Sequence, residues 1–345
     1  MLKTISLEDF KKSKGVSYSK LSKLADSPQA YQKALKEEVD SSSVSIGSAV
    51  DLLLTDPDNF NDEIYVMSTN KPSSDMMQVY VDELLRHGDS HAAWANSGYK
   101  LAEEKVHAKF LKEGKAYYDA IKQAEGKKIL GINDMMIANT IVSRIKEHPE
   151  IGKYFQTDDK YIELHFQVPI VWDFDYHSLV SNKKQNMIAK SVLDILVINH
   201  RTQSIIPVEL KTGAEGFMKS YWKYKRWLQG GMYYDAVKSL NYAHNNGQKY
   251  IVENTIFIYA DTNLYYPPII YKMTDRDITI ARRGRLYKSV VEKVDEHATN
   301  KHKVKGYLQL AAELEWHQAM NLWDYSHDVY KNNYSVNIDA FSIKL

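Results

Sequence analysis

The 345-residue chain contains no cysteine. This absence excludes disulfide bonds and cysteine-ligated iron–sulfur clusters, and it fits a reducing compartment. The formal net charge is only +1, so a contact with a polyanion would have to come from local groups of cations. Residues 1–20 contain no apolar run of signal-peptide length, and no run approaches the length of a membrane span. We therefore expect a soluble, cytoplasmic protein without a membrane partner.

Two apolar runs near the middle of the chain predict a β-hairpin. Val192–Asn199 and Ile205–Lys211 are rich in Ile, Val and Leu, and the polar stretch 199–204 joins them. A turn centred near Arg201 and Thr202 would place Asp194 opposite Glu209. Because side chains alternate along a strand, Glu209 and Lys211 would share one face.

Two carboxylates and a lysine at this spacing predict a metal-dependent nuclease. Directly opposed residues have Cβ atoms about 5 Å apart, and two buried carboxylates that close would repel each other. Mg²⁺ or Mn²⁺ would remove the repulsion, with Asp194, Glu209 and the backbone carbonyl of Leu210 as ligands. Lys211 would then orient the attacking water or stabilise the transition state. The alternative is a surface salt bridge between Asp194 and Lys211 across a simple hairpin.

The stretch 219–237 has helical spacing and no proline, so it predicts one helix. Lys219, Trp222, Arg226, Gln229 and Tyr233 recur at intervals of three and four and would line one face. Two cations, two aromatic rings and an amide are typical of a surface that binds nucleic acid, with Lys219, Trp222 and Arg226 as DNA contacts. The alternative is that the aromatic members are buried against the sheet. The adjacent pair Gly230–Gly231 suggests that another backbone or a substrate approaches closely.

Three stretches together resemble the PD-(D/E)XK nuclease superfamily, in the branch with the Gln-x-x-x-Tyr motif of RecB-type nucleases. They are VSYSKLSKLADSPQAY at Val16–Tyr31, IGSAVDLLLTDPDNF at Ile46–Phe60, and the run through Asp194, Glu209, Lys211, Gln229 and Tyr233. Within that branch the chain is most similar to RecE-like exonucleases, of the exonuclease VIII type, from phages and prophages. The resemblance implies an α/β restriction-endonuclease-like core, with a mixed central sheet flanked by helices, and catalytic roles for Asp194, Glu209, Lys211, Gln229 and Tyr233.

Two positions bear on the ligand set that the resemblance implies. Asp51 stands where the family usually has a metal-binding histidine, four residues after Gly47. An aspartate can supply an oxygen ligand to Mg²⁺ or Mn²⁺, but it could equally be a helix-surface or capping residue. Glu163 resembles a glutamate that the family often places upstream of the catalytic aspartate, and it could also be an ordinary exposed strand carboxylate.

The chain is expected to form a single nuclease domain, 1–345. Residues 1–150 would be mostly helical, with a hairpin at 16–37, a helix at 45–55, and further helices across 73–124 and 133–148. Residues 151–300 would form the catalytic core, including strands at 254–261 and 268–273 and a long helix at 275–296. Residues 301–345 would be a tail that serves packing or an oligomer contact.

The expected function is a metal-dependent DNA exonuclease that resects duplex ends, 5′ to 3′, in phage-type recombination or DNA processing. The resemblance implies a ring-shaped homo-oligomer and a phage single-strand annealing protein as partner. Two alternatives stay open. One is a PD-(D/E)XK endonuclease or nickase, and the other is a catalytically weak DNA-binding protein that keeps the fold.

Overall fold

The computed structural model describes residues 5–36, 45–242, 247, 249–290 and 299–334, with only the backbone for 286–290 and 299–303. Contacts divide the chain into two compact units. One consists of residues 1–39 and 145–345, and the other of residues 40–144. The N-terminal helical hairpin thus belongs to the same unit as the strand-rich region, although the sequence joins it to the helical part.

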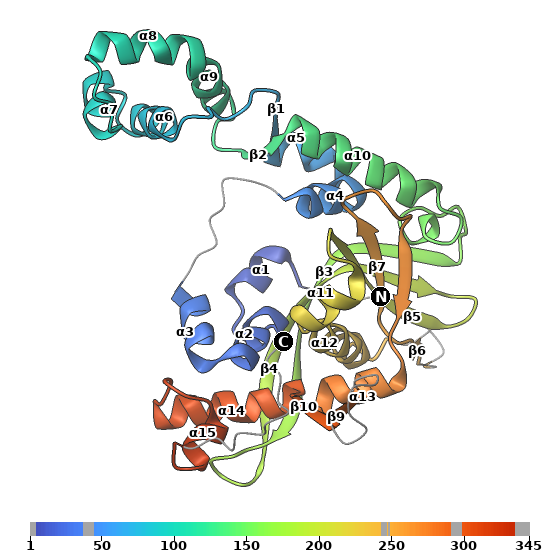
Figure 1. Ribbon diagram of the computed structural model, residues 1–345. Helices are drawn as coiled ribbons and strands as arrows, with labels where there is room; N and C mark the ends of the chain where they lie inside the picture. The colour runs from blue at the N-terminus through green and yellow to red at the C-terminus, as the bar shows by residue number, and fades with distance from the viewer. Residues whose placement is uncertain (1–4, 37–44, 243–246, 248, 291–298, 335–345) are drawn as a thin grey trace. The chain divides into compact units, whose positions relative to one another are not determined.

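The larger unit is built on a mixed sheet in the order β3-β4-β5-β7-β8, with β6 pairing beside β5. The strands are β3 (Ile162–His177), β4 (Lys184–Asn199), β5 (Ser204–Gly213), β6 (Ile251–Val252), β7 (Ile256–Asp261) and β8 (Ile269–Lys272). β3, β4 and β5 run antiparallel, whereas β7 is parallel to β5. The predicted α/β class with a mixed sheet and packed helices is confirmed (Figure 1).

Helices of the same unit pack on this sheet and on one another. They are α1 (Leu7–Lys12), α2 (Tyr18–Asp26), α3 (Pro28–Lys36), α11 (Phe217–Lys223), α12 (Arg226–Ser239), α13 (Asp275–Arg283), α14 (Tyr307–Met320) and α15 (His327–Lys331). A short strand pair, β9 (Arg285–Val290) with β10 (Thr299–Val304), connects α13 to α14. The predicted helices at 16–37 and strands at 254–261 and 268–273 are therefore present.

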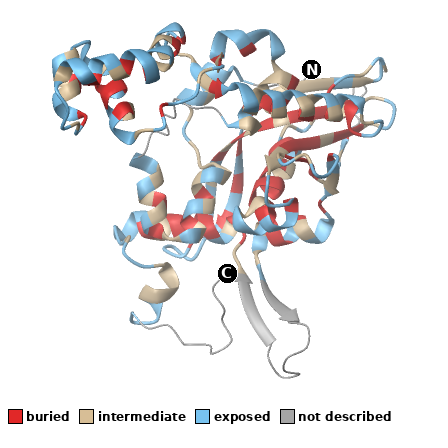
Figure 2. Ribbon diagram, turned by 45° about the horizontal axis from the view of Figure 1, so that its top comes forward, coloured by how far each residue is buried: buried red, intermediate tan, exposed pale blue. Residues whose placement is uncertain are grey.

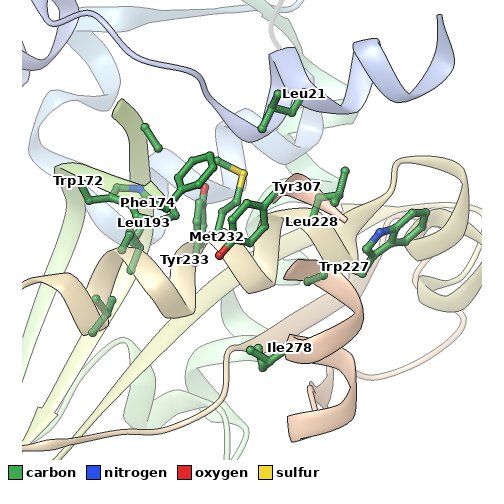
Figure 3. Packing of buried hydrophobic residues seen from close by; sticks show 14 of the residues in the cluster. Leu21, Trp172, Phe174, Leu193, Trp227, Leu228, Met232, Tyr233, Ile278 and Tyr307 are labelled. Carbon is green, nitrogen blue, oxygen red and sulfur yellow. The ribbon is translucent and has the colours of Figure 1, made fainter. Parts of the chain in front are cut away.

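The core of this unit lies between the sheet and α2, α12, α13 and α14. Leu193 from β4, Leu228 and Met232 from α12, and Tyr307 from α14 are all buried in it (Figure 3). Figure 2 shows the buried residues concentrated along the strands and the facing sides of these helices. Tyr307 belongs to the chain's last 45 residues, so α14 completes the core rather than forming a detached tail.

The second unit is helical apart from one short parallel strand pair. Its elements are α4 (Ile46–Thr55), the 3₁₀ turn Pro57–Asn59, α5 (Phe60–Glu63), β1 (Ile64–Met67), α6 (Asp75–His87), α7 (Ser90–Asn96), α8 (Glu103–Glu113), α9 (Lys115–Gln123), β2 (Lys128–Gly131) and most of α10 (Ile132–Glu147). Met77, Tyr80, Val81 and Phe110 are at the centre of a small core within α6–α9. The helices predicted across 73–124 thus pack on one another.

Two predicted helices are shorter in the structure. The helix expected at 275–296 ends at Arg283, because Gly284 has a φ of 70° and a Cβ there would lie 2.4 Å from the carbonyl oxygen of Val304. Residues 291–298 lie outside the described part of the chain. The helix expected at 219–237 is divided into α11 and α12 by Lys225, which has a left-handed φ of 53°.

The glycine pair in α12 allows close packing inside the protein. A Cβ on Gly231 would lie 2.2 Å from the Cβ of Ala281 in α13, and one on Gly230 would lie 2.2 Å from the Sδ of Met273. The close approach that the pair predicted is therefore made by α13 and by the chain after β8. A substrate is not needed to explain it.

Among the described residues, no helix combines the length and the apolar character that crossing a bilayer requires.

Candidate active site

The β4–β5 hairpin brings Asp194 and Glu209 together. The two strands pair from Asn199↔Ser204 to Ile195↔Val208, and continuing this register puts Asp194 opposite Glu209, as predicted. Regular pairing stops at that point. The backbone N–H of Leu210 instead donates to Oδ2 of Asp194 at 2.8 Å. The hairpin thus opens where its two carboxylates face each other.

Lys211, Gln229 and Asp194 surround the carboxyl group of Glu209, which is 1% exposed. Oε1 accepts hydrogen bonds from Nζ of Lys211 and from Nε2 of Gln229, the latter at 2.5 Å. The same Gln229 nitrogen donates to the hydroxyl of Tyr233 at 3.1 Å. The carboxyl group of Asp194 lies close enough to that of Glu209 for each to affect the ionisation of the other. The structure therefore collects all five residues that the sequence proposed as catalytic.

The carboxyl pair holds a proton at neutral pH. Burial, reinforced by the neighbouring Asp194 charge, raises the pKa of Glu209 to about 8, although Lys211 opposes the shift. Burial also raises the pKa of Asp194, against the opposing effects of Lys211 and the Leu210 N–H. Two buried carboxyl groups that face each other cannot both ionise without a compensating cation. Burying two carboxyl groups beside each other lowers the stability of the fold, so a purely structural role does not explain the arrangement.

The donor set of this cluster fits a divalent cation. Oε2 of Glu209 is buried and has no hydrogen-bond partner within the described residues, and the same is true of Oε1 of Gln229. In an extended strand the N–H and C=O of one residue point to the same side, so the Leu210 carbonyl faces the opening beside Asp194. Two carboxylates and one carbonyl match the way Mg²⁺ is held, with water and substrate phosphate completing its shell. The described residues provide no group of three or more His, Asp or Glu side chains that could bind a metal.

The residues expected to contact DNA are placed differently from one another. Arg226, at the start of α12, is half-buried and close enough to Glu209 for the two charges to influence each other. Its guanidinium lies 5.2 Å from the ring of Tyr224, and its Nε donates to Oγ of Ser220 at 3.3 Å. Trp222 is 41% exposed, and Lys219 lies on the surface 3.7 Å from a carboxylate oxygen of Glu215.

The break at Lys225 changes what the predicted helix face does. Gln229 and Tyr233 are buried beneath α12 against Glu209, whereas Lys219 and Trp222 belong to α11 and reach solvent. The five residues therefore do not form one continuous stripe. The interpretation that they form a single nucleic-acid face is corrected, because the two glutamine-motif residues serve the carboxyl pair from inside.

Glu163 is not part of the carboxyl cluster. It is in register with Ile198, four residues along β4 from Asp194. Its two carboxylate oxygens interact with Nε2 of His165 at 3.2 Å and Nε2 of His200 at 2.8 Å. Hydrogen bonds from these histidines lower the pKa of Glu163, despite the opposing effect of burial.

Asp51 belongs to the other compact unit, where it lies in α4 and is half-buried. Its backbone carbonyl accepts a hydrogen bond from Oγ1 of Thr55 at 2.8 Å. It is not the N-cap of its helix, because Ser45 has that position. Its role as a metal ligand stays a prediction.

Two residues near the cluster were not identified from the sequence. Gln167 on β3 lies between Phe166 and Val168, which pair with the two neighbours of Asp194 on β4. It has a left-handed φ of 48°, an unusual conformation for a residue inside a strand. Tyr18, in α2, is influenced by the charges of both Arg226 and Glu209, and its hydroxyl donates to the Tyr224 carbonyl. Tyr18 lies within the first stretch of the family resemblance, which was the only available signal.

No protein-family model and no curated protein matches the chain. Solved structures that are similar to it include one from Eubacterium rectale described as a "putative exonuclease". The two chains are 13% identical, each is covered over 80% of its length, and the TM-score is 0.42.

Proposed function

We propose that this protein is a metal-dependent deoxyribonuclease and that Asp194, Glu209 and Lys211 hydrolyse the phosphodiester bond. One observation carries the proposal. The opened end of a hairpin holds two facing carboxyl groups with a raised pKa, a lysine and an unpartnered buried carboxylate oxygen. Burying these groups together is unfavourable for stability, and ionisable groups with strongly shifted pKa values are typical of active sites.

The residues of the cluster have separable roles in this proposal. Asp194, Glu209 and the Leu210 carbonyl would bind Mg²⁺ or Mn²⁺, which when bound lowers the pKa of a coordinated water and neutralises charge on the phosphate. Lys211, already directed at Glu209, would donate to the attacking water or to a phosphate oxygen. Gln229 would hold the Glu209 carboxylate in position, and the Tyr233 hydroxyl would hold Gln229. Arg226 would bind a neighbouring phosphate.

We further propose that the enzyme resects duplex ends from 5′ to 3′. This part rests on the resemblance to RecE-like exonucleases, and so do the proposals of a ring-shaped homo-oligomer and of a single-strand annealing protein as partner.

The first test uses linear and closed-circular duplex DNA, incubated with the protein in Mg²⁺, in Mn²⁺ or in EDTA. We expect metal-dependent loss of the linear form alone, and no loss with Glu209→Gln, which keeps the shape of the side chain but not its charge. Asp175→Asn, on an exposed part of β3, is the matched control and should cleave normally. Cutting of the circle would favour an endonuclease. Binding without any cleavage would favour a catalytically weak DNA-binding protein.

A further inference from the structure

The turn between β7 and β8 presents two tyrosines to solvent. Tyr265 is 79% exposed and Tyr266 is 66% exposed. Their rings have no stacking partner within the described residues, and the stretch 262–268, TNLYYPP, contains no charged residue. Two adjacent exposed aromatic rings offer flat apolar faces on which a ligand can stack.

This turn is held in a fixed conformation. Asp261 is buried, and its two carboxylate oxygens accept hydrogen bonds from the backbone N–H groups of Asn263 at 3.0 Å and Tyr265 at 2.9 Å. Leu264 has a left-handed φ of 62°, which is costly for a branched side chain. Pro267 and Pro268 restrict the chain that follows. The two rings are therefore presented on a rigid support.

The turn lies at the end of the strand that carries Glu209 and Lys211. Asp261 is in register with Gly213, two residues after Lys211. The N–H of Thr262 donates to the Gly213 carbonyl at 3.1 Å, and Nδ2 of Asn263 donates to the Ala214 carbonyl at 3.2 Å. The carboxyl ends of parallel strands are where ligands of such sheets bind. The turn that carries the tyrosines thus adjoins the end of β5 that follows Glu209 and Lys211.

Helix α11 begins against β8, where Phe217 stacks on Tyr271, and the segment 218–224 carries further exposed aromatic and cationic side chains. Met218 is 51% exposed, Trp222 is 41% exposed and Tyr224 is 48% exposed. Lys219 and Lys223 both lie beside the single carboxylate of Glu215, so this group of three charges keeps a net positive charge. Aromatic rings beside an excess of cations are the combination that binds single-stranded nucleic acid.

We propose that Tyr265 and Tyr266 form a stacking platform for unpaired bases of the DNA strand at the active site; this rests on the proposed nuclease function. A base exposes its π-face only when it is unpaired, whereas a duplex presents phosphates. The turn itself carries no cation that could bind phosphates. The preferred substrate end would therefore be frayed or single-stranded where it meets the protein.

The test measures the binding of fluorescent oligonucleotides by anisotropy in a Glu209→Gln background, so that cleavage cannot interfere. The probes are a 12-nucleotide single strand and a blunt duplex. We expect Tyr265→Ala/Tyr266→Ala to weaken single-strand binding about tenfold, with less than a twofold change for the duplex. Tyr265→Phe/Tyr266→Phe keeps both rings and should bind like the parent. Tyr325→Ala/Tyr334→Ala removes two other exposed tyrosines and should also bind like the parent.

Equal single-strand binding by the alanine variant and the parent would overturn the proposal. An equal loss for both probes, or no single-strand binding by the parent, would also overturn it. The result can be distinguished from the nuclease test. Cleavage by the wild-type protein together with tyrosine-independent binding would contradict only the proposed stacking platform. Tyrosine-dependent binding without cleavage by the wild-type protein would contradict only the proposed nuclease function.

Discussion

At the scale of single residues, Glu209 determines the chemistry available to the site. It is almost completely buried, and one of its carboxylate oxygens receives both Lys211 and Gln229. The other oxygen has no partner among the described residues. A buried carboxylate satisfied on one side only is poised for a cation on the other.

Lys211 should be needed for cleavage but not for DNA binding. We expect Lys211→Ala to lower the cleavage rate about 100- to 1,000-fold, because it removes a donor directed at the reacting group. It should also raise the pKa of Glu209 further, since the lysine charge opposes the present shift. Lys12→Ala, on the surface of α1, is the control and should change neither cleavage nor DNA affinity. Persistent cleavage by Lys211→Ala would remove Lys211 from the mechanism.

Binding of Mg²⁺ should release a proton from the carboxyl pair. Because the pKa of Glu209 is raised to about 8, the pair still holds a proton at pH 7, and a cation must displace it. We expect Mg²⁺ affinity to rise from pH 6 to pH 9. Calorimetry at pH 7 in buffers of different ionisation enthalpy should show uptake of the proton by the buffer. Binding with no such dependence would contradict the proposed ligands.

The same pKa shift gives the metal-free protein a pH-dependent stability. The pKa of Glu209 is near 4.5 in the unfolded chain, and burial raises it to about 8 in the folded protein. Its contribution to stability is thus fully present below pH 4.5 and is lost as the pH rises through 8. Glu209→Gln should remove this dependence. Urea unfolding of both proteins between pH 5 and pH 9 in EDTA measures it.

At the scale of elements, the contact between α12 and α13 determines where Gln229 and Tyr233 lie. Gly231 lets α13 approach closely, and Asp235 one turn later binds Arg282 of α13 and Tyr307 of α14. These two features hold the buried face of α12 against the sheet. Helix α12 thereby places Gln229 within hydrogen-bond distance of Glu209.

Gly231→Ala should destabilise the protein, although alanine favours an isolated helix. The new Cβ would lie 2.2 Å from the Cβ of Ala281, which has no flexible end that could move aside. We expect a loss of about 1–3 kcal/mol in the free energy of unfolding, measured with urea. Adding Ala281→Gly restores the space and should recover most of the loss. An unchanged stability in the single variant would show that the helices separate freely.

At the scale of the whole molecule, the residues proposed as functional are divided between two compact units. Asp194, Glu209, Lys211, Gln229 and Tyr233 belong to the larger unit, whereas Asp51 belongs to the smaller one. The proposed role of Asp51 as a metal ligand therefore needs a test of its own.

Substitution of Asp51 tests whether its side chain is a metal ligand. We expect Asp51→His to retain or raise cleavage, because histidine is also a ligand for Mn²⁺, and Asp51→Ala to lower both cleavage and metal affinity. Asp58→Ala, an exposed residue just after the same helix, is the control and should change neither. If histidine and alanine at position 51 leave metal affinity unchanged, Asp51 is structural.

The sequence alone determined the hairpin and its register. Alternation of apolar residues and the length of the polar turn are local properties, so they placed Asp194 opposite Glu209 before any packing was known. Helical spacing predicted the main helices, and the mixed α/β class was implied by the family resemblance. The residues proposed as catalytic could be grouped from the sequence because four of them, from Glu209 to Tyr233, lie within 25 positions of one another.

Only the tertiary structure decided what surrounds these residues. Helical spacing could not show that the chain breaks at Lys225, that Gln229 is buried against Glu209, or that the glycine pair faces α13 and Met273. It could not show that Glu163 binds two histidines, or that Tyr265 and Tyr266 stand beside the end of β5. Each of these depends on which distant segment packs at a position, and sequence spacing carries no information about that.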